Sequence, residues 1–293
     1  MRTTGWVERI IQIFFFLLSL AIIMPFILVV CISFSDEQSL LQHGYRFIPE
    51  TYSIEAYKYV FQSPTILLRA YGVTITVAVV GTIIGLLVTS MTAYVISRRD
   101  FRYNRSATFY IFLTMLFSGG IVSYYILMTQ YLGLRDSLWA LILPGLLTPW
   151  NVMVMKGFLS KIPIEIVESA KMDGASETRT FFTMILPLAK PALATIGLLI
   201  SFTYWNEWFN SMLFIDDDKR VPLQLMLVRI MNTIEFLSAN AEFAASIDIN
   251  PSDFPSLSMR MAMAVLVAGP MLLVFPFFQR YFVRGLTIGS LKG

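Results

Sequence analysis

Long runs without a charged residue alternate with short polar segments along this chain. Runs of roughly 18 or more such residues are typical of membrane-spanning helices, because backbone polar groups in hydrocarbon must be hydrogen-bonded within their own segment. Five runs contain no Asp, Glu, Lys or Arg, and a sixth is interrupted only by Glu207; they are residues 10–34, 70–97, 106–134, 137–155, 261–279 and 191–215. The pattern predicts an all-α, polytopic membrane protein with six transmembrane helices, and we expect residues 1–293 to form one transmembrane domain.

Composition agrees with a lipid environment. Hydrophobic residues make up 56% of the chain and charged residues 14%, whereas a soluble domain usually carries about 25% charged residues. Gly81 and Gly85 form a GxxxG pair in the second run. Small residues at this spacing permit close helix packing, although ordinary tight packing explains the pair as well as a dimer face does.

Several kinds of functional site are not expected, because the residues that they need are scarce in this chain. Cys31 is the only cysteine and His43 the only histidine, so an intrachain disulfide, a Cys/His zinc cluster or a Cys-His catalytic pair is not expected. The chain has no Gly-Lys-Ser or Gly-Lys-Thr, and hence no phosphate-binding P-loop. We therefore expect no catalytic residue, metal or cofactor in this chain, and expect ATP and Mg²⁺, if they are used, to bind partner subunits.

The distribution of cations predicts the orientation. Arg2 and Arg9 precede the first apolar run, which is too long for the core of a signal peptide, so we expect an uncleaved first helix. With both termini cytoplasmic, the inner segments hold fourteen Lys and Arg residues and the outer segments eight, as the positive-inside rule requires. The net charge of +3 therefore reflects orientation and not a nucleic-acid partner.

This topology leaves three long connections. The outer segments 35–69 and 216–260 are too long for simple turns, and their apolar and aromatic residues indicate packed structure or a docking surface. Between the fourth and fifth runs lies an inner segment, residues 158–190. Pro163 and Gly174 predict a helix over about 163–172 with a left-handed exit, and Ser176 can cap a second helix that Pro187 would end.

The inner segment also carries a motif. Glu168-Ser169-Ala170, Asp173-Gly174-Ala175 and Met184-Ile185-Leu186-Pro187 resemble the EAA motif of bacterial ABC-importer permeases, which reads E-A-A, three residues, G, nine residues, I-x-L-P. Here Ser169 stands for the first alanine and Met184 for the isoleucine, and the spacings on both sides of the glycine are kept.

The resemblance extends over most of the chain. Trp205-Asn206-Glu207-Trp208 and the run from Phe275 to Gly285 are similar to the carbohydrate-uptake branch, which includes the shorter maltose permease subunit. The C-terminal Ile288-Gly289-Ser290-Leu291-Lys292-Gly293 resembles oligosaccharide permeases.

The resemblance implies a type I ABC-importer permease in the bacterial cytoplasmic (inner) membrane. Its partners would be a second, homologous permease, two ATP-binding subunits and an extracytoplasmic binding protein that delivers a sugar, and the resemblance of the C-terminus indicates an oligosaccharide. The inner segment would be the coupling helix, with Ile164 and Val167 filling a groove of the ATPase. The residues expected to couple this chain to ATP hydrolysis are Glu168, Ser169, Ala170, Asp173, Gly174, Arg179 and Pro187.

Residues of the solute path are indicated by polar and aromatic side chains within the spans. At about 1.5 Å per residue, Asn206 would lie some 22 Å along a helix that begins at Pro191, in the outer half of the bilayer. A carboxylate such as Glu207 at that depth usually faces a bundle interior or a water-filled cavity, whereas tryptophans there also occur in interfacial belts. The candidates for the solute path are Trp205, Asn206, Glu207, Trp208, Tyr125 and Asn151, with helix packing as the alternative, above all for the last two.

Another class of function is a secondary transporter or channel for a small polar solute. A secondary transporter would normally show internal repeats and titratable groups near the bilayer midplane, and Glu207 is the only acid within a predicted span. A membrane-embedded hydrolase would need His, Cys or paired carboxylates within the spans. A second permease and a secreted binding protein encoded beside this chain would favour the importer.

Overall fold

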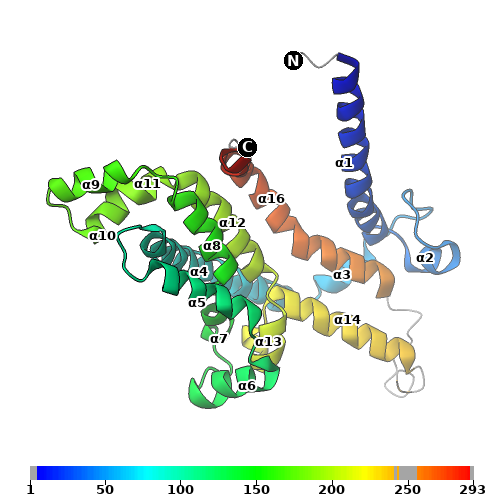
Figure 1. The fold of residues 1–293 in the computed structure, drawn as a ribbon. Coiled ribbons are helices and arrows are strands. Elements are labelled where there is room, and N and C mark those ends of the chain that lie inside the picture. Colours follow the sequence, from blue (N-terminus) through cyan, green and yellow to red (C-terminus); the bar gives the residue numbers. More distant parts are fainter. Residues whose placement is uncertain (1–4, 241–242, 244–255, 291–293) are drawn as a thin grey trace. The chain divides into compact units, whose positions relative to one another are not determined.

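The structure is a computed structural model that describes residues 5–240, 243 and 256–290, and Figure 1 shows the order of its helices. Within these ranges the regular structure is helical, apart from one isolated bridge between Ser35 and Tyr52. Contacts divide the chain into two compact units. The first comprises Met1–Leu68 and Met226–Pro270, and the second comprises Arg69–Leu225 and Met271–Gly293.

The first unit packs short helices around the ends of long ones. Its elements are α1 (Gly5–Ser33), α2 (Glu37–His43), α3 (Glu55–Val60), most of α14 (Leu223–Ala239) and the first part of α16 (Ser256–Ser290). Ala56, Ile234, Met259 and Ala262 form a buried apolar cluster. The Glu37 carboxylate accepts hydrogen bonds from the backbone N–H groups of Leu257 and Ser258 at 2.9 and 3.0 Å. Segments 35–69 and 216–260 therefore contain packed helices, as the sequence predicts.

The second unit contains the candidate functional segments. Its elements, in chain order, are most of α4 (Pro64–Ser97), α5 (Asn104–Leu116), α6 (Gly120–Ile126), a π turn (Leu127–Tyr131), α7 (Trp139–Ile142), a 3₁₀ turn (Leu143–Gly145), α8 (Pro149–Leu159), α9 (Ile164–Met172), α10 (Glu177–Thr180), a π turn (Phe181–Ile185), α11 (Leu186–Leu188), α12 (Lys190–Trp205), α13 (Phe209–Phe214), a 3₁₀ turn (Asp218–Arg220), the start of α14 and the last part of α16.

Length and composition allow up to six membrane spans among the described residues. Gly5–Ser33, Pro64–Ser97 and Ser256–Gln279 are each long and apolar enough to cross a bilayer. Three bent pairs add to these if each pair counts as one span: Asn104–Leu116 with Gly120–Tyr131, Trp139–Gly145 with Pro149–Leu159, and Glu177–Leu188 with Lys190–Trp205. The six-span fold predicted from the hydrophobic runs is thereby supported.

The prediction that each run forms one continuous helix is wrong for three of the six. The helix in 106–134 breaks after Leu116 and bends by 111°, and Gly120 adopts a positive φ of 80° there. The run 137–155 bends by 46°, with Pro144 in the 3₁₀ turn and Pro149 at the start of α8, because proline cannot continue the hydrogen bonding of a preceding helix. The run 191–215 breaks after Trp205.

Glycines let the second run pack closely against later elements. A Cβ at Gly81 would lie 2.6 Å from the ring of Tyr204 on α12, and one at Gly145 would lie 2.9 Å from the same ring. The Tyr204 hydroxyl donates a hydrogen bond of 2.7 Å to the carbonyl oxygen of Ile142. Gly81 thus serves packing within the chain, and a Cβ at Gly85 would similarly contact Leu146 at 3.4 Å.

Candidate functional site

Helix α9 is a short helix with clear local end signals. Pro163 directly precedes it with a φ of −56°. At its other end Gly174 has a φ of +72°, the Ala175 N–H bonds to the Ala170 carbonyl at 2.9 Å, and the Gly174 N–H bonds to the Lys171 carbonyl at 3.0 Å. This pair of bonds is the Schellman motif, which needs a residue that tolerates the left-handed conformation. The predicted helix and its glycine exit are confirmed.

Helix α10 begins at the predicted cap but continues further than expected. The Ser176 hydroxyl accepts a hydrogen bond of 3.3 Å from the Arg179 N–H, as an N-cap serine does. The helical run then passes through a π turn into α11 and ends at Leu188, so the prediction that Pro187 ends it is wrong. Because the π turn starts a new α-helical segment, Pro187 lies in the first turn of α11, where its missing N–H costs little.

The expected coupling residues divide into an exposed and a buried group. Glu168, Ser169, Asp173 and Arg179 are exposed, and Ile164 and Met172 extend this face by helical spacing, with Met172 83% exposed. Ala170 and Val167 are buried on the opposite face of α9. The expectation that Val167 fills a groove of a partner is therefore wrong in this structure, because it packs within its own chain.

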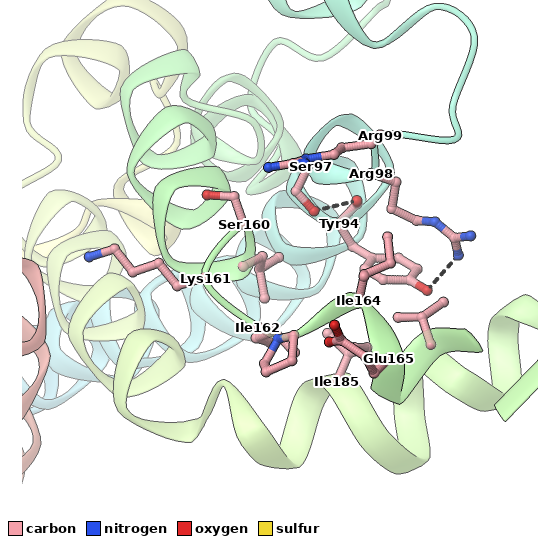
Figure 2. A pocket seen from close by; sticks show the side chains of 13 residues that line it. Tyr94, Ser97, Arg98, Arg99, Ser160, Lys161, Ile162, Ile164, Glu165 and Ile185 are labelled. Atoms are coloured by element: carbon pink, nitrogen blue, oxygen red, sulfur yellow. Dashed lines mark hydrogen bonds between the residues drawn. The ribbon is translucent and has the colours of Figure 1, made fainter. Parts of the chain in front are cut away.

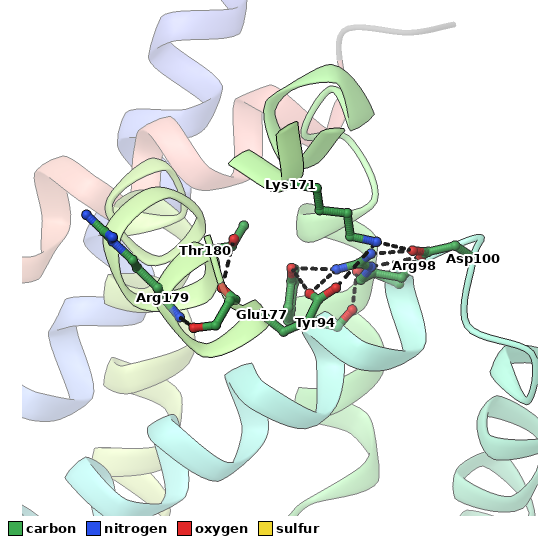
Figure 3. Close-up of polar contacts among 9 residues, drawn as sticks. Tyr94, Arg98, Asp100, Lys171, Glu177, Arg179 and Thr180 are labelled. Carbon is green, nitrogen blue, oxygen red and sulfur yellow. Dashed lines mark hydrogen bonds and ion pairs between the residues drawn. The ribbon is translucent and has the colours of Figure 1, made fainter. Parts of the chain in front are cut away.

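Four charged side chains form a ring that joins α9 and α10 to the residues just after α4 (Figure 3). Arg98 pairs with both Asp100 and Glu177. Lys171 lies 3.0 Å from the Asp100 carboxylate and 3.4 Å from that of Glu177. The Tyr94 hydroxyl accepts a hydrogen bond of 2.9 Å from Arg98 and donates one of 3.3 Å to Glu177. We call these four charged residues the ionic ring.

The ring favours the charged forms of Arg98, Asp100 and Lys171. The hydrogen bond from Arg98 holds the pKa of the Asp100 carboxyl well below its ordinary value, against a smaller opposing effect of burial. The hydrogen bond to Asp100 raises the pKa of Arg98 and, in the same way, that of Lys171. Sequence reasoning missed the ring, since its members are far apart in the chain; the one signal was Asp100, the only acid among residues 98–105.

A cavity of about 310 Å³ lies beside the ring, between the end of α4 and the start of α9 (Figure 2). Its walls combine the polar residues Ser97, Arg99 and Glu165 with the apolar Ile162 and Ile164. A second cavity of about 300 Å³ lies on the other side of Tyr94 and Arg98, against Phe101 and Glu177. Tyr94 and Arg98 line both cavities.

The motif Trp205-Asn206-Glu207-Trp208 forms the break between α12 and α13. The Glu207 carboxylate accepts hydrogen bonds from the backbone N–H of Asn210 at 2.8 Å and from its side-chain amide at 3.0 Å. Glu207 therefore caps the start of α13. The placement of Asn206 inside a continuous helix is corrected: it follows the last residue of α12, and its amide oxygen accepts a bond of 3.0 Å from Gln224.

The other candidates for the solute path have mixed positions. Tyr125 stacks on Phe214 of α13 with ring centroids 5.8 Å apart, and its neighbour Tyr124 donates a hydrogen bond of 2.9 Å to Asn210. Trp205 is 7% exposed. Asn151 lies buried in the first turn of α8, and Trp208 is exposed. Tyr125 and Glu207 thus both contact α13, Tyr125 through Phe214 and Glu207 through Asn210. The sequence did not predict that they share this helix, because nothing in the pattern marks Asn210 or Phe214.

The bent apolar helices are typical of a polytopic membrane protein, and the helix-glycine-helix segment lies between two of its possible spans. Comparison with protein families agrees: residues 81–288 match the family described as binding-protein-dependent transport system inner membrane component. The chain belongs to this family. Family membership decides against the secondary transporter or channel, and it classifies the chain as a transport component and not as an enzyme.

Individual relatives match over nearly the whole chain. Protein LplC of Bacillus subtilis (strain 168) is 37% identical over 271 residues, covering 92% of this chain and 90% of the relative. The polygalacturonan/rhamnogalacturonan transport system permease protein YtcP of the same strain is 36% identical over 286 residues, covering 98% of each. A crystal structure of a bacterial ABC transporter that imports the acidic polysaccharide alginate contains a chain with a TM-score of 0.78 and 27% identity, covering 96% of this chain and 98% of that one.

Proposed function

We propose that this chain is one of two permease subunits of an ATP-driven importer that takes up an oligosaccharide. The observation that carries the proposal is the α9–α10 segment, with its Schellman exit at Gly174 and an exposed face of Ile164, Glu168 and Met172. A rigid, exposed two-helix projection suits a surface that receives force from another subunit. The sugar is supported by the relatives, of which YtcP is named for polygalacturonan and rhamnogalacturonan.

The remaining parts of the assembly follow from this assignment. The chain has no P-loop sequence, so ATP and Mg²⁺ would bind two ATPase subunits that dock on the α9–α10 segment. A second, homologous permease would complete the path, and an extracytoplasmic binding protein would deliver the sugar. The whole chain would form one transmembrane domain with both termini on the cytoplasmic side.

The proposal is tested by uptake into proteoliposomes that contain the reconstituted complex. A panel of labelled oligosaccharides should include galacturonate oligomers, alginate oligomers and neutral oligomers such as maltotriose. We expect binding-protein-dependent, ATP-dependent uptake of at least one oligosaccharide. Uptake that needs neither ATP nor a binding protein, or that is restricted to a non-carbohydrate solute, would overturn the proposal.

The coupling role has its own test in two variants of the α9–α10 segment. Gly174→Val and Glu168→Lys should lower the amount of ATPase that purifies with the permease, or uncouple ATP hydrolysis from uptake, while the membrane helices remain folded. A Gly174→Val complex with full ATPase content and normal coupling would show that α9–α10 is only a connection.

A further inference from the structure

The α9–α10 segment is joined covalently to only two of the long helices around it. The chain enters α9 from α8 through residues 160–163, and it leaves through the π turn and α11 into α12. Helix α4 is far away in sequence and has no such connection. Any movement of the segment can reach α4 only through non-covalent contacts.

Those contacts are few and specific. The rings of Tyr94 and Phe181 have centroids 5.3 Å apart, and Arg98 follows the last residue of α4. Cavities of about 310 and 300 Å³ are both lined by Tyr94 and Arg98, so the packing around this junction is interrupted. The ionic ring and Tyr94 therefore provide the defined link.

The ionic ring fixes the orientation of its side chains as well as the distances between them. The Arg98 side chain is 11% exposed, and its guanidinium is held by one carboxylate on each side, Asp100 from the loop after α4 and Glu177 from α10. A planar guanidinium with fixed donors orients its carboxylate partners more strictly than an isolated ammonium does. Lys171 of α9 closes the ring by pairing with the same two carboxylates. Both helices of the segment are thus tied to one point at the end of α4.

We propose that the ionic ring is a brace that transmits movement of α9 and α10 to α4, so that Arg98, Asp100, Lys171 and Glu177 are positioning residues for coupling ATP hydrolysis to transport. This rests on the proposed function of α9–α10 as the ATPase-docking segment. The exposed ion pair between Lys171 and Glu177 contributes little to folding stability by itself, and its effect is on which helices move together.

The brace is tested by charge reversal in the reconstituted complex. Glu177→Lys places three cations around Asp100 and should lower the number of sugar molecules imported per ATP hydrolysed by about tenfold, a normal size for a coupling between sites. Arg102→Glu is the control, since Arg102 is an exposed charged residue between α4 and α5, outside both the ring and the α9–α10 segment, and it should keep the wild-type ratio. Equal ratios for the two variants, both with full ATPase content, would overturn the brace.

Reversing the whole ring provides a rescue. The variant Arg98→Glu/Asp100→Arg/Lys171→Glu/Glu177→Lys restores alternating charge, and the Tyr94 hydroxyl can serve it because a hydroxyl both donates and accepts. The import ratio should recover at least half of the value lost in Glu177→Lys. A ratio no better than that of Glu177→Lys would overturn the role of charge pairing.

A covalent replacement tests the same point without reversed charges. In a Cys31→Ser background, Asp100→Cys/Lys171→Cys removes two ring members and should lower the import ratio, and a short bifunctional thiol reagent should restore it by joining the two positions. Failure of the cross-link to restore the ratio, or a wild-type ratio before cross-linking, would contradict the brace. If the wild-type complex itself neither binds ATPase nor imports sugar, the proposed function fails, which is distinct from failure of the brace.

Discussion

Gly174 has backbone angles that other residues rarely adopt. Its φ of +72° forms the exit of α9, and a Cβ added there would meet no atom within 4 Å. Glycine is therefore required at position 174 because of the backbone conformation, and not because a side chain would lack space. Gly157 in α8 also has open space around it, but it has no positive φ. The two glycines make a matched pair in which only the backbone differs.

Gly174→Ala and Gly157→Ala should have opposite effects on stability. Alanine at position 174 costs roughly 1–2 kcal/mol because its Cβ crowds the following carbonyl in the left-handed region. Alanine within a helix is favoured over glycine by roughly 0.5–1 kcal/mol, so Gly157→Ala should be neutral to stabilising. Thermal unfolding of the purified complex measures both shifts, and a fall in midpoint for Gly157→Ala as large as that for Gly174→Ala would refute the conformational account.

Gly81 is required for a different reason, which is the space occupied by Tyr204. A Cβ would lie 2.6 Å from the tyrosine ring, and the ring is held by the bond of its hydroxyl to Ile142. Gly81→Ala should therefore destabilise the fold by about 1–3 kcal/mol through overpacking. Gly72→Ala is the control on the same helix, since a Cβ there meets nothing within 4 Å. Comparable unfolding midpoints for both variants would contradict the close packing of Tyr204.

At the scale of single elements, sequence reasoning succeeded where the signals are local. Pro163, Gly174 and Ser176 lie within three residues of the helix ends that they determine, so the bounds of α9 and the start of α10 could be predicted. The breaks in the longer apolar runs could not, because hydrophobicity alone does not distinguish a straight span from a bent pair. The ionic ring depends on residues 98–100 meeting residues 171–177, and that contact exists only in the tertiary structure.

The stability that the ionic ring contributes should depend on pH only in strongly acidic or strongly alkaline solution. The pKa of Asp100 is lowered by its hydrogen bond with Arg98, so the stability it contributes is present above the ordinary value of about 3.9 and is lost as the pH falls through the folded value. The pKa of Lys171 is raised, so its contribution is present below about 10.4 and is lost only as the pH rises further.

The unfolding midpoint of Asp100→Asn should therefore lie below that of the wild type by a constant amount between pH 5 and 9, and the difference should shrink below about pH 4. Glu165→Gln, which removes a carboxylate of α9 outside the ring, serves as the control. A difference between Asp100→Asn and the wild type that changes steadily between pH 6 and 8 would contradict the direction of the Asp100 shift.

Glu207 has a structural contact that bears on its proposed role in the solute path. Because its carboxylate caps α13 through Asn210, Glu207→Gln keeps one oxygen acceptor and should leave complex assembly intact while uptake falls. Trp205→Ala is a poor test, since a tryptophan that is 7% exposed loses roughly 3–5 kcal/mol of packing when truncated. Uptake assays with matched unfolding measurements distinguish the two effects, and normal uptake by Glu207→Gln would remove Glu207 from the solute path.

At the scale of the whole molecule, the all-helical fold and the family could be predicted because composition and the spaced motif act over the full length of the chain. The apolar runs predicted six spans, which the structure allows if each bent pair is one span, and the motif from Glu168 to Pro187 predicted the class of transporter. The roles of individual solute-path residues depend on which side chains face a cavity within the assembled permease pair, and a pattern along one chain does not contain that. The orientation of the chain in the membrane is a prediction that rests on the cation count alone.

Orientation can be tested with two exposed positions on opposite predicted sides. Ile48 is 77% exposed and lies in the predicted outer segment 35–69, whereas Tyr103 is 59% exposed and lies between α4 and α5 on the predicted inner side. In a Cys31→Ser background, Ile48→Cys should react with a membrane-impermeant maleimide in intact cells, and Tyr103→Cys should react only after the cells are permeabilised. Since both positions are exposed in the folded chain, protection of one reports the membrane and not burial. Labelling of Tyr103→Cys in intact cells with protection of Ile48→Cys would invert the topology and would place α9–α10 on the side away from ATP.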